Sequence, residues 1–187
     1  MELFPRLQLG FFNGWLLAAI FYLVFGILLL IFPRPVVARL YDRTGQGGRQ
    51  VTARRLLAVP LFLGWLALVA LSPLKRGETV FVIGLAVWAL GLLGFVSALL
   101  SYRNTPLDQP VTSGLYRVSR HPQQLTLSLS FLGIPIAIGS WLALVLICIG
   151  FIGAHFKIVA EERACLEQYG ESYRDYTKRV ARYFLFF

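Results

Sequence analysis

Two short polar stretches stand out in an otherwise apolar chain, and their side chains could bind a charged ligand. The first is residues 112–122 (TSGLYRVSRHP), with Arg120 and His121 near its end, and the second is the pair Glu161 and Glu162. Arginine and histidine donate hydrogen bonds to anions, whereas carboxylates accept them from hydroxyl and ammonium groups. Ionisable groups beside apolar helices at a lipid boundary are candidate functional sites.

The neighbours of these residues predict how the side chains point. Pro122 suits the first turn of a helix, where no N–H group is needed, and it keeps His121 extended. Arg120 and His121 are therefore aimed at the entrance of the helix that follows. Glu161 and Glu162 point about 100° apart if they are helical, so one can face a ligand while the other pairs with an arginine. The alternative is that these charges only contact lipid phosphates and solvent.

The rest of the chain predicts helices that cross a membrane. Of 187 residues, 57% are hydrophobic and 14% are charged, against about 25% charged in soluble domains. Apolar runs long enough to span a bilayer predict helices near 10–32, 56–74 and 80–102. We therefore expect an all-α, polytopic helical bundle that forms a single integral membrane domain over residues 1–187.

The uncharged run 125–156 is too long for one crossing. Its 32 residues would make a helix of about 48 Å, whereas the hydrocarbon layer is about 30 Å thick. Glycines and Pro135 also interrupt it. The run therefore predicts a helical hairpin with arms at 122–138 and 140–160, which gives about five transmembrane helices. Both polar stretches then lie at the same membrane face.

The basic residues predict the orientation. Fifteen of the 18 Lys and Arg residues follow the first, third and fifth spans. By the positive-inside rule, the N-terminus lies outside and the C-terminus in the cytoplasm. The same distribution accounts for the net charge of +9 without a nucleic-acid partner, because the chain has no RNP-like or zinc-knuckle pattern.

The tail, residues 161–187, carries one apolar stripe with helical spacing. Its members lie three or four residues apart: Leu166, Tyr169, Tyr173, Tyr176, Val180 and Tyr183. This spacing predicts a C-terminal amphipathic helix that lies on the membrane surface, with its tyrosines at the interface.

Other residues have plainer interpretations. Gly91 and Gly94 in the third span predict close helix packing, with a cofactor lying against them as the alternative. Nothing in the spacing of His121 and His155 places them face to face on a haem iron, so no metal site is expected. The two cysteines are expected to be free thiols.

The two polar stretches, taken as residues 112–122 and 161–184 (EERACLEQYGESYRDYTKRVARYF), resemble the isoprenylcysteine carboxyl methyltransferase and phospholipid methyltransferase group. Those enzymes carry T-x-G-x-Y-R-x-x-R-H-P before their last helical hairpin and E-E-x-x-x-L-x-x-[FY]-G-x-x-Y-x-x-Y-x-x-x-V-x-R after it. The resemblance implies a multi-pass enzyme, here of a prokaryotic cytoplasmic membrane. It implies transfer of a methyl group from S-adenosylmethionine to a carboxylate, thiol or amine on a membrane lipid or a lipidated molecule.

The resemblance also implies roles for individual residues. Arg120 and His121 would act in catalysis, and the cofactor-binding residues would be Tyr116, Arg120, His121, Pro122, Glu161 and Glu162. The chain departs from the group at Gln124 and Thr126, where a tyrosine and a small residue are usual, and this departure leaves the acceptor open.

Two other functions fit parts of the sequence. Sterol-reductase-like membrane enzymes use NADPH and have a C-x-x-x-Y-G pattern, which Cys165, Tyr169 and Gly170 match. A non-catalytic membrane protein that binds lipid is the third interpretation.

Overall fold

The computed structural model describes residues 1–3, 5–41 and 49–183, and the side chains of all of these except 49–57. The elements of this part of the chain are seven α-helices and one short 3₁₀ helix, η1, which confirms the predicted all-α class. Their bounds are α1 Trp15–Ile31, α2 Arg34–Tyr41, α3 Arg49–Leu71, α4 Thr79–Arg103, η1 Gly114–Arg117, α5 Pro122–Ala137, α6 Trp141–Tyr169 and α7 Glu171–Arg179.

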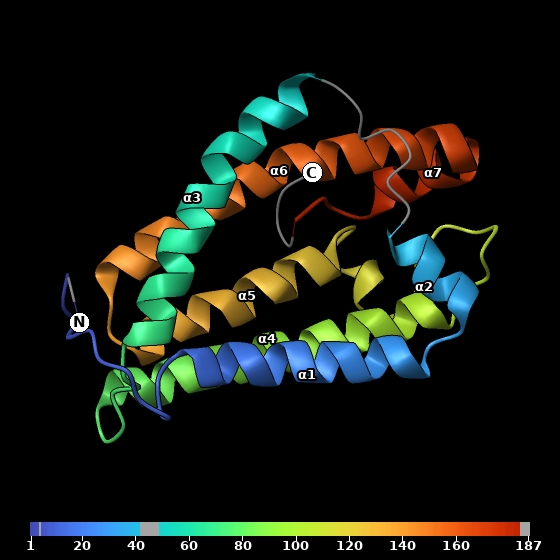
Figure 1. Cartoon of the computed structure of the whole chain (residues 1–187). Helices are drawn as coiled ribbons and strands as arrows, with labels where there is room; N and C mark the ends of the chain where they lie inside the picture. Colours follow the sequence, from blue (N-terminus) through green and yellow to red (C-terminus); the bar gives the residue numbers. More distant parts are fainter. Residues whose placement is uncertain (4, 42–48, 184–187) are drawn as a thin grey trace.

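The long helices form an elongated bundle with different segments at its two ends. Helices α1, α4 and α5 lie alongside one another, and α3 packs against α6 (Figure 1). The N-terminal residues lie at the end of the bundle that holds the α5–α6 turn, where the Glu2 amide donates to the Gly139 carbonyl oxygen. The opposite end gathers α2, η1 and α7 (Figure 1).

Helix length and composition support a membrane location. Within the described residues, α4 and α6 are each long and apolar enough to cross a bilayer, and α1 and the Ala58–Leu71 part of α3 are shorter apolar helices. The 16 residues of α5 extend for only about 24 Å, less than the hydrocarbon thickness of about 30 Å. Large apolar side chains such as Leu30 and Leu93 face outward, as expected for helices in contact with lipid.

The predicted hairpin is present between α5 and α6. Gly139 makes the turn with φ +69°, and Ser140 caps α6 because its hydroxyl accepts a hydrogen bond from the Ala143 amide. The predicted arms, 122–138 and 140–160, match the starts of both helices. Helix α6 continues to Tyr169, nine residues beyond the predicted end, since no residue breaks it before Gly170.

The tail is helical and amphipathic, as predicted, but it is divided between the end of α6 and a separate helix, α7, and two of its tyrosines are buried in the protein rather than at an interface. Gly170 has φ +55° and separates α6 from α7. Helix α7 therefore turns back, and Tyr173 and Tyr176 are only 5% and 3% exposed. Tyr173 and Tyr176 pack inside the protein because α7 presents them to η1 and the end of α6.

Close packing of α4 on α5 depends on three glycines. A Cβ atom on Gly84 would lie 2.3 Å from the Ala137 amide nitrogen, and one on Gly91 would lie 2.3 Å from that of Ser130. A Cβ atom on Gly133 would lie 2.5 Å from the Trp88 amide nitrogen of α4. The predicted packing role of Gly91 is thus confirmed, and the α4–α5 pair forms a rigid support for the segments at its end.

We predict that Gly91→Ala lowers the unfolding temperature of the detergent-solubilised protein. Forcing a methyl group into this contact costs about 1–3 kcal/mol, more than the ~1 kcal/mol that alanine gains in helix propensity. Circular dichroism during heating measures the change. Gly26→Ala in α1 is the control, because no atom lies within 4 Å of its added Cβ. Equal unfolding temperatures for both variants would contradict the packing role.

Candidate active site

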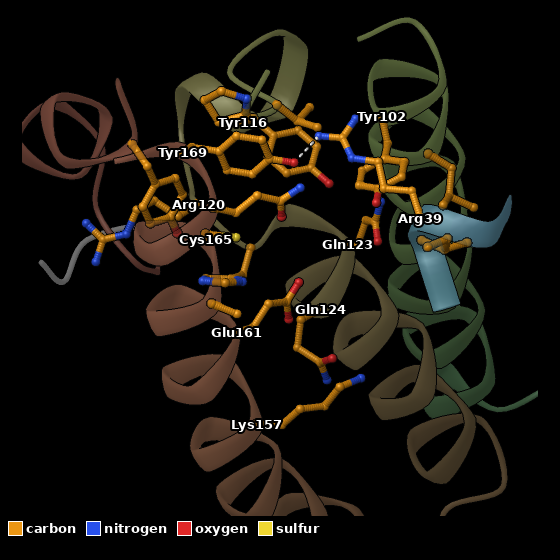
Figure 2. Close-up of a pocket in the computed structure, with 18 of the residues that line it drawn as sticks. Arg39, Tyr102, Tyr116, Arg120, Gln123, Gln124, Lys157, Glu161, Cys165 and Tyr169 are labelled. Atoms are coloured by element: carbon orange, nitrogen blue, oxygen red, sulfur yellow. Dashed lines mark hydrogen bonds between the residues drawn. The ribbon is translucent and has the colours of Figure 1, made fainter. Parts of the chain in front are cut away.

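A cavity of about 410 Å³ lies at the end of the bundle that holds α2, η1 and α7. It is lined by side chains of α1, α2, α4, η1, α5, α6 and α7 (Figure 2). Its volume is within the range of about 300–1,000 Å³ that is usual for sites of small molecules and cofactors. Tyr116, Arg120, His121 and Glu161 line it, so both polar stretches of the sequence reach one cavity.

Arg120 and Glu162 join the two polar stretches directly. The Arg120 Nε donates to Glu162 Oε1 at 2.8 Å, and both side chains are less than 10% exposed. Arg120 Nη1 also donates to the carbonyl oxygens of Thr177 and Val180, at 2.9 Å each. The guanidinium therefore links the loop before α5 to α6 and α7, which confirms that the two stretches converge.

The side chain of His121 belongs to the same cluster. Its Nε2 lies 3.2 Å from Glu162 Oε1, and its backbone amide donates to Ser119 Oγ. Pro122 is buried as the first residue of α5 and does not reach the cavity. His121 is thus held beside the cavity wall by a carboxylate, with the proline fixing the start of the helix.

The two adjacent glutamates have different environments. Glu162 is 7% exposed and accepts from Arg182 at 2.7 Å as well as from Arg120, and it does not line the cavity. Glu161 lines the cavity and makes no hydrogen bond or ion pair within the described part of the chain. The prediction that one of the two glutamates pairs with an arginine is therefore confirmed, and this glutamate is Glu162.

The residues after α7 close one side of the cluster. The backbone amide of Arg120 donates to the Ala181 carbonyl oxygen, and Ser119 Oγ donates to the Arg182 carbonyl oxygen. The hydrogen bond to Glu162 raises the pKa of Arg182 further, so this arginine stays charged. The segment around Ala181 is therefore fastened to the loop before α5 by both backbone and side-chain bonds.

Tyrosines form much of the remaining wall. Tyr176 donates its hydroxyl hydrogen to the Tyr116 carbonyl oxygen at 2.7 Å. Burial raises the pKa of Tyr116, Tyr173 and Tyr176 above the usual range, so all three phenols remain protonated. These three side chains therefore offer neutral aromatic faces and protonated hydroxyl groups.

The glycine of the first motif is required by backbone geometry. Gly114 begins η1 with φ +59°, and a Cβ there would lie 2.2 Å from Ser101 Oγ of α4. Only glycine fits both conditions. The turn that it permits places Tyr116 in the wall of the cavity.

Arg39 of α2 is a cavity residue that sequence analysis missed. Its Nη2 donates to Gln109 O at 2.7 Å and to the Tyr169 hydroxyl at 3.1 Å (Figure 2), and its guanidinium lies 4.9 Å from the centre of the Tyr102 ring. These contacts attach α2 to the ends of α4 and α6. In the sequence, no local pattern distinguishes Arg39 from the other arginines that follow the first predicted span.

Further polar side chains that were not predicted reach the cavity from α5 and α6. Gln123 and Gln124 line the cavity, and Gln123 Nε2 is buried without a partner in the described part of the chain. Lys157 and Cys165 reach it from α6. By contrast, His155 is bound elsewhere, because its Nδ1 lies 2.7 Å from the Tyr183 hydroxyl.

Comparison with known families decides which of these features are shared. The family model described as Phospholipid methyltransferase matches residues 79–172, which is half of the chain. The chain belongs to the phospholipid methyltransferase family. This is a family of membrane-integral methyltransferases, and the predicted resemblance is confirmed. No curated protein and no solved structure matches the chain.

The match divides the cavity of this phospholipid methyltransferase family member into two parts. It begins with α4 and ends just inside α7, so it contains the loop with Arg120 and the glutamates of α6. Phe25 and Arg39 come from α1 and α2, before the matched residues. Tyr173 and Tyr176 of α7 come after them, so the cavity has lining residues outside the family match on both sides.

We predict that Glu162→Gln destabilises the protein. The change leaves Arg120 buried beside a neutral group, and loss of one partner of a buried ion pair costs on the order of 3–5 kcal/mol. Thermal unfolding in detergent should show a marked drop in midpoint.

The matched control is Glu171→Gln on α7, whose ion pair with Arg174 is more than 60% exposed on both sides. Exposed pairs contribute little, so this variant should unfold like the unmodified protein. A similar midpoint for both variants would mean that the Glu162 cluster does not hold the three segments together.

Proposed function

We propose that this protein transfers a methyl group from S-adenosylmethionine to an acceptor carried in the membrane. The observation that carries the proposal is the cavity at one end of the apolar helices, which is lined by residues of both family motifs. Membership of a methyltransferase family favours this function over an NADPH-dependent reductase and over a non-catalytic lipid-binding protein.

The side chains of the cavity suit the chemical groups of S-adenosylmethionine. Glu161 can accept hydrogen bonds from the ammonium group or the ribose hydroxyls, and Arg120 can donate to the carboxylate. The faces of Tyr102 and Tyr116 suit an adenine ring or a sulfonium cation. The unpartnered amide of Gln123 adds a hydrogen-bonding group for a ring nitrogen or a carbonyl.

The reaction needs positioning more than it needs acid or base chemistry. An electron pair of the acceptor forms a bond to the methyl carbon, and the sulfur keeps the pair of the broken S–C bond and becomes a neutral thioether. A carboxylate or thiolate acceptor loses no proton in this step, whereas an ammonium group must first lose one. We propose that Arg120 and His121, both held by Glu162, fix the reactants in line.

We also propose five membrane spans, with the N-terminus outside and the site end of the bundle in the cytoplasm. The distribution of basic residues and the hairpin support this orientation. A cysteine introduced at Gly77, in the turn between α3 and α4, should react with a membrane-impermeant maleimide added outside intact cells. Reaction only after the membrane is opened would contradict the orientation.

The test of the proposed function is the variant Glu161→Gln. Loss of a charged hydrogen-bond partner should weaken S-adenosylmethionine binding by roughly tenfold or more. Glu161 has no ion pair in the described structure, so the variant should fold normally. Isothermal titration calorimetry of the purified protein in a neutral detergent measures the dissociation constant.

Glu167→Gln is the matched control, because Glu167 is an exposed glutamate of α6 that does not line the cavity. Its affinity for S-adenosylmethionine should be unchanged. Heat of binding with NADPH and none with S-adenosylmethionine would favour a reductase, and no heat with either would favour a lipid-binding protein. Equal affinities of the two variants for S-adenosylmethionine would mean that Glu161 does not contact the cofactor.

A further inference from the structure

Lys157 occupies a special position on α6. It is the first Asp, Glu, Lys or Arg residue of this helix, after 16 residues without any. Its side chain is exposed and lines the cavity. Figure 2 shows Lys157 and Gln124 on the side of the cavity opposite to Tyr116 and Tyr169. Lys157 therefore lies at the edge of the cavity nearest the apolar part of α6.

The positive charges of the cavity are not equivalent. Arg120 is paired with Glu162, and Arg39 is bound to the Tyr169 hydroxyl and to backbone carbonyl oxygens. Lys157 makes no hydrogen bond or ion pair within the residues that the structure describes. Its ammonium group is thus the cation of this cavity that has the most freedom to bind a ligand.

The cavity that Lys157 lines combines this charge with apolar surface. Phe25, Phe95 and Leu127 line the same cavity and belong to the hydrophobic core of the bundle or pack on it. An amphiphile could place its hydrocarbon chain against these side chains and its polar end near the ammonium group. A negatively charged end would be attracted there, whereas an amine end would be repelled.

We infer that Lys157 binds the anionic group of an amphiphilic ligand: a carboxylate, a thiolate or a phosphate. A lysine suits this role because its flexible stem lets one point charge follow groups of different shape. Glu161 lies one helical turn further along α6, on the side proposed for the cofactor. The anionic amphiphile is then the methyl acceptor, and this last step alone rests on the proposed function.

The experiment compares probes that differ only in their polar end. Laurate, lauryl phosphate and lauryl alcohol compete with a dansylated fatty acid for the purified protein in maltoside micelles, and dansyl fluorescence reports displacement. The unmodified protein should bind one or both anions roughly tenfold more tightly than the alcohol. The preference for laurate or for lauryl phosphate distinguishes a carboxylate site from a phosphate site.

Lys157→Gln should abolish the preference for anions, and Lys157→Arg should retain it. Arg163→Gln is the matched control, because it removes an exposed positive charge from α6 outside the cavity and leaves the protein with the same net charge as Lys157→Gln. Equal binding of the alcohol and both anions by the unmodified protein, or the same loss of preference in Arg163→Gln, would overturn the inference.

Binding of S-adenosylmethionine is measured on the same variants to separate the two proposals. Its affinity should be the same in the unmodified protein and in Lys157→Gln. If S-adenosylmethionine fails to bind while the anion preference still depends on Lys157, the proposed function fails and the anion site remains. If S-adenosylmethionine binds while no anion preference exists, the anion site fails and the proposed function remains.

Discussion

Burying a carboxylate beside apolar helices costs free energy that only well-placed cations and hydrogen bonds can offset, and Glu162 has three such partners. Arg120 and His121 come from the end of the loop before α5, and Arg182 comes from the segment after α7. Because these partners come from different parts of the chain, the carboxylate is satisfied only when the hairpin is closed and the tail has folded back. The same condition completes the cavity.

Neighbouring residues of helix α6 have different roles because they point in different directions. Glu162 faces the ion-pair cluster, whereas Glu161, about 100° around the helix, faces the cavity. Lys157 lies one turn before Glu161 and faces the same cavity, which apolar side chains also line. Helix α6 thus provides the Glu162 carboxylate, which holds the tail in place, and also the proposed contacts to the cofactor and the acceptor. Tyr173 and Tyr176 cover the cavity from α7, which is why the tail folds inward.

Those features that depend on local chemistry could be predicted from the sequence. The uncharged run between the motifs implied a hairpin, and adjacency on a helix implied different roles for Glu161 and Glu162. The direction of the tail could not be predicted, because helical spacing is kept on both sides of Gly170 while its φ of +55° sends α7 back. Arg39 was missed because its partners, Gln109 and Tyr169, lie 70 and 130 residues away. Spacing along the chain carries no information about such contacts.

We propose that the cavity between the two motifs binds S-adenosylmethionine. Cys165 gives the most direct test, because its thiol lines the cavity, and Cys148, the other free cysteine, does not. In a Cys148→Ser background, the rate at which Cys165 reacts with a small alkylating reagent reports whether the cavity is filled. S-adenosylmethionine should slow this reaction in a saturable manner, and NADPH should not. An unchanged rate at high concentrations of S-adenosylmethionine would contradict it.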